Sequence, residues 1–219
     1  MRVVNVVLTA VFSQKVDLVR FTRLTGADYR PMVFAAASLR FNNPRCTLLL
    51  FQSGRCVCIG ATCVHDAHYG IDCCLRVLIY LYAEVYLLHT AVQNIVTHDD
   101  VGDAVDINRL AADDAMQTQY NPELFPGLRM ALTCDGNSRA TIFYQGNIIV
   151  TGCRCMDTVA AAWHEVKSKI EAYRVRKQQL ACNALTHINN AMQRQIDRLL
   201  YDEPQSEVTE VGGALASSE

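Results

Sequence analysis

Cysteine and histidine are the residues of this chain with the widest chemical potential. The 219 residues include ten cysteines and six histidines. A structural zinc site needs four convergent ligands and usually begins with a short Cys-x-x-Cys arm. The chain has no Cys-x-x-Cys, and the closest cysteines are Cys56 and Cys58, Cys73 and Cys74, and Cys153 and Cys155. We therefore predict reduced, buried structural cysteines without a bound metal, as is typical of intracellular proteins.

A catalytic cluster is the alternative use of these side chains. His65 and His68 lie near Cys73 and Cys74 in a segment with helical periodicity. Catalysis at such a cluster would need a suitably spaced partner carboxylate or a glycine-rich phosphate loop, and we recognise neither pattern here. We predict that the protein is not an enzyme and has no cofactor.

The bulk composition is that of a folded domain. Apolar residues make up 51% of the chain and charged residues 19%, which is enough to bury a core. No run of 18 apolar residues is present, and the first residues lack the features of a secretory signal. We expect neither a membrane span nor secretion.

The chain contains an internal repeat at an offset of about ninety residues. Tyr29-Arg30-Pro31 aligns with Tyr120-Asn121-Pro122, and the phenylalanine that follows aligns as well. Further matches keep the same order: Asn5 with Asn94, Phe51 with Phe143, Gly54 with Gly146, and Gly60 with Gly152. An ordered series of this length predicts two copies of one structural unit.

Each copy predicts the same succession of elements. Hydrophobic patterning predicts strands over 3–10, 33–40, 46–52 and 55–60, and helices over 15–24 and 64–82. The second copy predicts strands over 91–98, 127–133, 139–144 and 147–152, with helices over 104–116 and from Asp157 onward. We expect an α+β fold with the order β-α-β-β-β-β-α twice, forming one curved antiparallel sheet with helices on one face.

Both faces of this sheet are predicted to be apolar. Alternation along a strand puts Val57 and Ile59 on one face and Cys56 and Cys58 on the other. Helices can cover only one of the two faces. The second apolar face therefore needs a binding partner.

These segments resemble the core of the TATA-box-binding protein family. The most specific match is the string from Tyr120 to Leu128, YNPELFPGL, supported by Phe34-Ala35-Ala36 and Phe51-Gln52-Ser53-Gly54. The resemblance covers about residues 3–173. It implies a saddle-shaped sheet with helices on the convex side and a concave face that lies on the minor groove of promoter DNA, the family's own mode of binding.

The resemblance assigns roles to particular residues. Two phenylalanine pairs would wedge between base pairs, Phe34 with Phe51 and Phe125 with Phe143. The residues expected to contact base edges and the groove floor are Asn5, Val7, Val57, Asn94, Val96, Ile149 and Thr151. These residue types suit a groove floor of A·T pairs, which presents only hydrogen-bond acceptors.

The chain also departs from the family pattern. Ile59 stands where the family has a threonine, and Val33 stands where a basic residue is usual. Arg40, Arg45 and Arg55 remain as expected phosphate contacts of the first repeat, whereas Ala131, Asn147 and the turn over 134–138 replace basic residues of the second.

The net charge follows the same division. Residues 1–91 hold nine Lys and Arg against five Asp and Glu, a net of +4, and residues 92–173 hold six against eleven, a net of −5. Phosphate neutralisation dominates protein–DNA affinity. We therefore expect weak or relaxed DNA recognition. We also expect that the second phenylalanine pair has no positively charged residues around it. Asp99, Asp100, Asp103, Asp106, Asp113 and Asp114 are either a solvated face or a docking face for a basic partner.

The resemblance also implies partners and a location. A transcription factor B-type protein would dock on Glu123 and Leu124, and a factor A-type protein near residues 27–29. A complex that binds small-nuclear-RNA promoters is a further implied partner, and the nucleus is the expected compartment. The alternative is a saddle that acts as an interaction hub in a transcription complex and binds DNA weakly or not at all.

The expected domain boundaries are 1–90 and 91–173 for the two repeats, 174–202 for an extra helix and 203–219 for an acidic disordered tail. Trp163 is predicted to pack in the core on the last helix of the second repeat. The extra helix carries apolar residues at helical spacing: Leu180, Leu185, Ile188, Met192, Ile196 and Leu199. This degree of divergence, with a cysteine-rich core, suggests an early-branching protist or a large DNA virus as the source.

Overall fold

The computed structural model describes residues 1–175, 185–186 and 188–195. The chain divides into two units, Met1–Val175 and Arg176–Glu219. The described residues of the second unit are helical, and Leu185, Ile188 and Met192 are exposed there. Leu180, Ile196, Leu199 and the predicted tail lie outside the described residues.

The first unit is built on one antiparallel sheet of nine strands, in the order β2-β3-β4-β1-β5-β10-β9-β8-β7. The strands of the first repeat are β1 (Arg2–Phe12), β2 (Ala36–Asn42), β3 (Arg45–Phe51) and β4 (Arg55–Ala61). Those of the second are β5 (Leu87–Asp100), β7 (Thr118–Gln119), β8 (Leu128–Ala131), β9 (Arg139–Ile142) and β10 (Asn147–Cys153). The first strands of the two repeats, β1 and β5, pair at the centre of the sheet.

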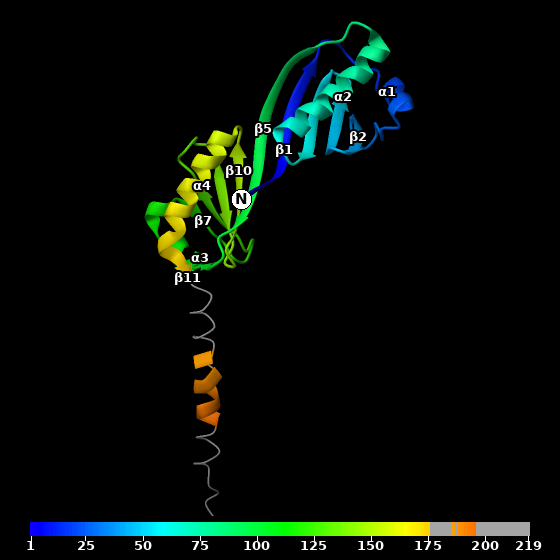
Figure 1. Cartoon of the computed structure of the whole chain (residues 1–219). Helices are drawn as coiled ribbons and strands as arrows, with labels where there is room; N and C mark the ends of the chain where they lie inside the picture. The colour runs from blue at the N-terminus through cyan, green and yellow to red at the C-terminus, as the bar shows by residue number, and fades with distance from the viewer. Residues whose placement is uncertain (176–184, 187, 196–219) are drawn as a thin grey trace, which may run out of the picture. The chain divides into compact units, whose positions relative to one another are not determined.

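Helices cover one face of this sheet. They are α1 (Leu18–Thr25) and α2 (Val64–Tyr82) in the first repeat, and α3 (Ile107–Ala111) and α4 (Met156–Ile170) in the second. Two 3-10 turns follow α3 and α4, η1 (Asp114–Met116) and η2 (Glu171–Tyr173). Figure 1 shows α2 lying along the strands of the first repeat and α4 along those of the second. The predicted α+β sheet with helices on one face is confirmed.

Counting only strands of the nine-stranded sheet, the predicted element order holds in full in the second repeat alone. There β7 is the short strand after the helix and pairs with β8. In the first repeat this strand is reduced to a single bridge between Asp28 and Ser38. An additional small sheet joins β6 (Ala104–Val105) to β11 (Arg174–Val175), so the compact unit extends two residues beyond Tyr173.

Several predicted boundaries are wrong, and local hydrogen bonds explain two of them. The segment 104–116 is not one helix, because Asp106 caps α3 and Asp113 separately caps η1 through hydrogen bonds from the Arg109 and Ala115 N–H groups. The strand predicted from residue 33 begins at Ala36, because the N–H groups of Val33 and Phe34 both donate to the Arg30 carbonyl in a turn.

The core consists of two clusters, one under each half of the sheet. Residues such as Leu8, Phe21 and Leu78 fill the first cluster, and Ile95, Leu128 and Trp163 belong to the second. Trp163 is 4% exposed, and its indole N–H donates to Thr97 Oγ1 at 2.8 Å. The prediction that Trp163 packs in the core is confirmed.

Seven of the nine described cysteines are either buried in the core or cap a helix, whereas Cys73 is half-buried and Cys134 is exposed. Cys46, Cys56, Cys58, Cys74 and Cys153 are buried, as predicted. Cys63 and Cys155 are exposed instead, because each is the N-cap of a helix, α2 and α4 respectively, where its sulfur accepts a backbone N–H. The nine cysteines of the described residues are free thiols.

Most of the second-repeat aspartates have partners within the protein. Asp99 forms ion pairs with the N-terminal amine and with Lys167, and Asp103 pairs with Arg174. Asp106 and Asp113 act as caps, and Asp100 accepts the Gly102 N–H at 2.8 Å. These contacts account for much of the acidic excess without an external partner. No helix in the described residues is long and apolar enough to cross a membrane.

Candidate nucleic-acid interface

The face of the sheet opposite the helices, here called the outer face, carries the predicted site residues. Cys56 and Cys58 are buried beneath the helices, and Val57 and Ile59 alternate with them on the outer face, half-buried. In β10, Ile148 and Val150 are buried and Ile149 and Thr151 lie on the outer face. The predicted assignment of faces is confirmed, and the outer face is largely apolar.

Each repeat presents one phenylalanine pair on this face. The rings of Phe34 and Phe51 pack edge to face with their centroids 6.0 Å apart, and those of Phe125 and Phe143 do so at 5.9 Å. Phe34 is 47% exposed and Phe125 is 38% exposed, unusually high fractions for such large apolar side chains. We call these the two wedge pairs.

The exposed member of each wedge pair is held by a turn. In the first repeat the Phe34 N–H donates to the Arg30 carbonyl, and in the second the Phe125 N–H donates to the Asn121 carbonyl at 3.0 Å. Gly127 makes room beside the second pair. A Cβ atom at this position would lie 2.6 Å from the Phe125 ring and 3.0 Å from the Phe143 ring.

Two asparagines lie at the centre of the outer face. The pairing of β1 with β5 puts Asn5 opposite Val96 and Val7 opposite Asn94, so the four predicted central residues are brought together. Asn5 Oδ1 accepts the Gly60 N–H at 2.7 Å, and Asn94 Oδ1 accepts the Gly152 N–H at 2.8 Å. With the oxygen engaged, each carboxamide offers its NH₂ group as a donor.

Corresponding positions of the repeats form rows across the sheet. In the first repeat, pairing aligns Arg40 of β2 with Thr47 of β3, and Thr47 with Ile59 of β4. The second repeat has a matching row made of Ala131, Arg139 and Thr151. A second pair of rows contains Ser38, Leu49 and Val57 in the first repeat and Arg129, Thr141 and Ile149 in the second.

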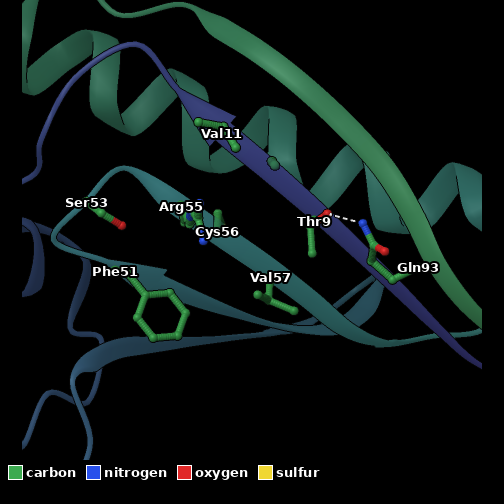
Figure 2. Close-up of a pocket in the computed structure, with 9 residues that line it drawn as sticks. Thr9, Val11, Phe51, Ser53, Arg55, Cys56, Val57 and Gln93 are labelled. Carbon is green, nitrogen blue, oxygen red and sulfur yellow. Dashed lines mark hydrogen bonds between the residues drawn. The ribbon is translucent and has the colours of Figure 1, made fainter.

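The first-repeat arginines border hollows in the outer face. Arg40 and Arg45 line a hollow of about 510 Å³ together with Asn5 and Ile59. Arg55 borders a neighbouring hollow of about 580 Å³ with Phe51 and Val57, and Figure 2 shows these residues with the hydrogen bond from Gln93 Nε2 to Thr9 Oγ1. The predicted phosphate contacts therefore lie beside the predicted apolar contacts.

Sequence reasoning missed two arginines of the second repeat. Arg129 and Arg139 line one hollow of the outer face with Thr141 and Thr151, and the Arg129 guanidinium lies 5.4 Å from the centre of the Phe125 ring. The expectation that the second wedge pair lacks a positive surround is therefore wrong. The signal was available, because Met130 and Ala140 are apolar core residues and their neighbours must face outward.

The proposed partner residues lie on the turn that carries Phe125. Leu124 is 84% exposed, and Glu123 is exposed beside it, with its N–H donating to Asn121 Oδ1. Val33 occupies the corresponding position of the first repeat and is 82% exposed. The two turns therefore present apolar side chains to solvent at this corresponding position, and the first turn also exposes Met32.

The histidines and cysteines of α2 do not form a site. His65 and His68 are exposed, whereas Cys74 is buried in the core. In the part of the chain that the structure describes, no three His, Cys, Asp or Glu side chains are grouped so that they could hold a metal ion.

Known proteins show the same fold and sequence pattern. The family model for transcription factor TFIID, the TATA-binding protein, matches residues 1–81 and 89–173. A TATA-box-binding protein of Natronomonas pharaonis is 33% identical over 170 residues, which cover 76% of this chain and 90% of the relative. A TATA-box-binding protein of Tetrahymena thermophila is 30% identical over 165 residues, covering 74% of this chain and 66% of the relative.

A solved structure agrees with these relatives. The Methanococcus jannaschii TBP has a TM-score of 0.66 and 26% sequence identity, over 78% of this chain and 98% of that chain. The fold and the doubled outer face define a saddle-like α+β protein of the TATA-binding class. The chain belongs to the TATA-binding protein family, as a divergent member.

Proposed function

We propose that this protein binds promoter DNA in the minor groove through its outer face and nucleates assembly of a transcription initiation complex in the nucleus. The observation that carries the proposal is the presence of two wedge pairs on the outer face, each with one exposed phenylalanine. The centre of the same face holds Asn5 and Asn94, whose side-chain NH₂ groups are oriented as donors. Inserted apolar rings unstack base steps and bend the duplex, and the bend lets more of the sheet contact the DNA.

The central asparagines and Thr151 suit A·T pairs. Such pairs present only acceptors in the minor groove, and the amide NH₂ groups of Asn5 and Asn94 are donors. The apolar residues Val57 and Ile149 suit a groove floor that lacks the guanine amino group. Arg40, Arg45 and Arg55 border this area and supply positive charge to the phosphates.

The test is fluorescence anisotropy with a short A·T-rich duplex, combined with energy transfer between the duplex ends to measure bending. We expect binding at low salt, about 50 mM, where phosphate contacts are strongest. The double variant Phe34→Ala/Phe51→Ala should lose more than about tenfold in affinity, or about 1.4 kcal/mol, and most of the bend. Tyr80→Ala is the control, because Tyr80 is 78% exposed on α2, away from the outer face.

Failure of the wild-type protein to bind at low salt would overturn the proposal. The protein would then act as an interaction hub within a transcription complex. Exposed turns, such as the one that carries Leu124, would be its protein-binding surfaces. Equal binding by the wild type and the double variant would instead remove the wedge role of Phe34 and Phe51.

The partner proposal concerns the exposed turn of the second repeat. Glu123 and Leu124 are the proposed contact for a factor B-type protein, and the edge over residues 27–29 is the proposed contact for a factor A-type protein. A complex on small-nuclear-RNA promoters is a further proposed assembly. Leu124→Ser should abolish the supershift of the DNA complex by a factor B-type protein without changing DNA affinity, whereas Val33→Ser on the matching turn should leave the supershift intact.

A further inference from the structure

The two halves of the outer face differ in chemistry although their backbones correspond. In the row nearest the central asparagine, the first repeat has Arg40 on β2 and Thr47 on β3. In the second repeat the arginine has changed strands, with Ala131 on β8 and Arg139 on β9. The second repeat has not lost this charge, because the charge has moved to the neighbouring strand.

The move brings the guanidinium toward the centre of the sheet. In the strand order, β8 lies toward the edge, and β9 is next to β10, which pairs with the central β5. Adjacent strands are separated by about 4.8 Å. The backbone of Arg139 therefore lies about one strand spacing closer to Asn94 than the backbone of an arginine at position 131 would. Its cross-strand neighbour on the inner side is Thr151.

The next row gains an arginine on the strand nearer the edge, β8, rather than moving one inward. Arg129 lies opposite Thr141 in the second repeat, where the first has Ser38 opposite Leu49. Thr151 likewise takes the position of Ile59. The second half of the face therefore carries threonines where the first half has Leu49 and Ile59, and arginines where the first half has the uncharged Ser38 and Thr47.

In the described part of the chain, neither guanidinium has an acidic partner. Among the residues that the structure describes, no carboxylate lies within ion-pair distance of Arg129 or Arg139, whereas Arg30 and Arg174 do form ion pairs. Arg139 makes one long contact, from Nη1 to the Ser138 carbonyl at 3.4 Å. Both charges are thus available to a ligand on the outer face.

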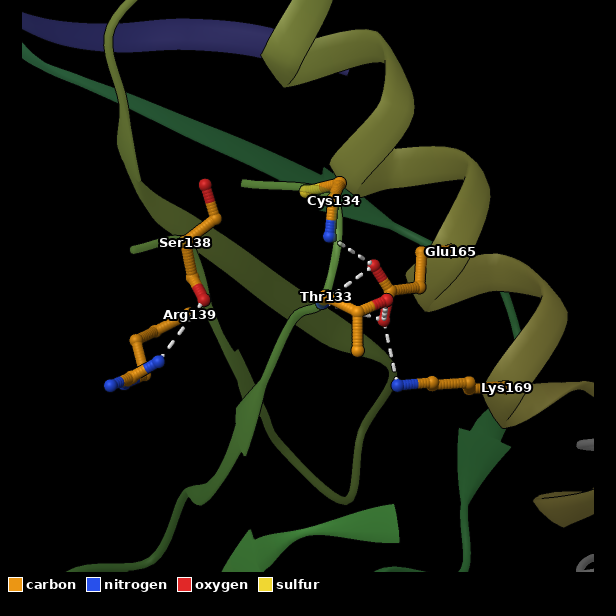
Figure 3. A network of polar contacts seen from close by, with 6 residues as sticks. All are labelled: Thr133, Cys134, Ser138, Arg139, Glu165 and Lys169. Carbon is orange, nitrogen blue, oxygen red and sulfur yellow. Dashed lines mark hydrogen bonds and ion pairs between the residues drawn. The ribbon is translucent and has the colours of Figure 1, made fainter. Parts of the chain in front are cut away.

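The turn before Arg139 is held from the opposite side. Glu165 of α4 accepts the N–H groups of Thr133 and Cys134 at 3.0 and 3.1 Å and pairs with Lys169 at 2.7 Å. Figure 3 shows this cluster beside α4 and Arg139 on the side away from it. Asp135 closes the turn by accepting the Ser138 N–H at 2.7 Å. The hairpin that sets the position of Arg139 is therefore anchored to the core helix.

We propose that Arg129 and Arg139 are specificity residues that donate to base-edge acceptors of the minor groove, so that the second repeat selects the more A·T-rich half of the binding site and orients the protein on DNA. This rests on the proposed function. Minor grooves of A·T tracts have strong negative potential that attracts arginine, and the guanine amino group would put a donor against these donors. The corresponding first-repeat residues, Ser38 and Thr47, are uncharged, so a G·C pair would cost the first repeat no arginine contact at these positions.

The test measures orientation on a duplex with four A·T pairs in one half of the site and mixed sequence in the other. A donor fluorophore replaces the exposed Tyr80 of α2 through an unnatural amino acid, and the acceptor is placed at either end of the DNA. We expect stronger energy transfer to an acceptor at the mixed end, because the first repeat should lie over that half. Inosine·cytosine in place of the G·C pairs should reduce the preference, since inosine lacks the amino group.

The matched variant is Ala131→Arg/Arg139→Thr, which restores the first-repeat row and keeps the net charge. We expect it to bind with a similar salt dependence and to lose most of its orientation preference, and Arg129→Ser should lower the preference further. Arg139→Lys keeps the charge alone and tests whether the guanidinium is needed.

The outcomes separate the two proposals. Tight binding by the wild type with equal energy transfer to acceptors at the two DNA ends would overturn the specificity role and leave minor-groove binding intact. A reversed preference, or an unchanged preference in the Ala131→Arg/Arg139→Thr variant, would also overturn it. Absence of wild-type binding would remove the proposed function and this inference with it.

Discussion

The side-chain oxygen of Asn94 accepts the backbone N–H of Gly152 at 2.8 Å across the centre of the sheet. Asn5 makes the same contact with Gly60 at 2.7 Å. This bond fixes which end of each carboxamide faces outward, and it makes the exposed group a donor. The two repeats therefore present donors at equivalent central positions.

Asn94→Asp separates the structural role of this residue from its binding role. The aspartate can still accept the Gly152 N–H, so the thermal midpoint should change little. DNA affinity should fall at least about tenfold, or about 1.4 kcal/mol, because a donor is replaced by a negative charge facing groove acceptors. Anisotropy and thermal melting measure the two effects, and unchanged affinity would show that Asn94 does not contact bases.

Gly127→Ala tests the packing of the second wedge pair. The added methyl group would meet the rings of Phe125 and Phe143 and the Thr141 side chain. Overpacking of this kind costs about 1–3 kcal/mol in the free energy of unfolding. Urea denaturation should show this loss, and Phe125→Ala in the same protein should recover much of it, because the nearest obstructing atom is then gone. Additive effects of the two substitutions would contradict this packing.

Glu165 makes stability depend on pH. Burial raises the pKa of this carboxyl, but the hydrogen bonds from Lys169 and Thr133 outweigh burial, so the pKa lies below its usual value. A lowered folded-state pKa contributes stability that is present above the unfolded-state pKa and is lost as pH falls through the folded-state pKa. The wild type should therefore lose stability below about pH 4.5, the usual carboxyl range.

Glu165→Gln should remove part of this acid sensitivity and cost about 1–3 kcal/mol at neutral pH, because charged hydrogen bonds to Thr133 and Cys134 are weakened. Urea denaturation from pH 3 to pH 7 measures both changes. Glu171→Gln is the control, since Glu171 is 69% exposed in its pair with Arg174. Equal pH profiles for the wild type and Glu165→Gln would contradict the assignment.

The cysteines should differ widely in reactivity. Hydrogen bonding with Thr158 lowers the pKa of Cys155, whereas burial raises the pKa of Cys58 to about 12. Because the thiolate is the nucleophile, iodoacetamide should modify Cys155 many times faster than Cys58 in the folded protein. Peptide mass spectrometry measures both rates. Thr158→Val should slow the modification of Cys155 several-fold. Equal modification rates for Cys155 and Cys58 in the folded protein would contradict the predicted difference in reactivity.

The sequence by itself determined the repeat, the sheet and the faces. Ordered matches such as Phe34 with Phe125 depend only on the chain, and period-2 alternation is enough to separate Val57 from Cys58. The same alternation was sufficient to place Arg129 on the outer face, although the net charge of the second repeat predicted a face without positive charge. The net charge of a repeat counts Asp99 and Asp103 in the same way as residues of the outer face. These two aspartates, however, form ion pairs with the N-terminal amine and with Arg174.

The tertiary structure decided which residues meet across strands. Alternation assigns a residue to a face, but strand register selects its neighbours, and register here depends on the turn that Glu165 and Asp135 hold. Only the folded sheet therefore shows that Arg139 occupies the row of Arg40 one strand nearer the centre. The direction of the Asn94 carboxamide is likewise set by an N–H group 58 residues away along the chain.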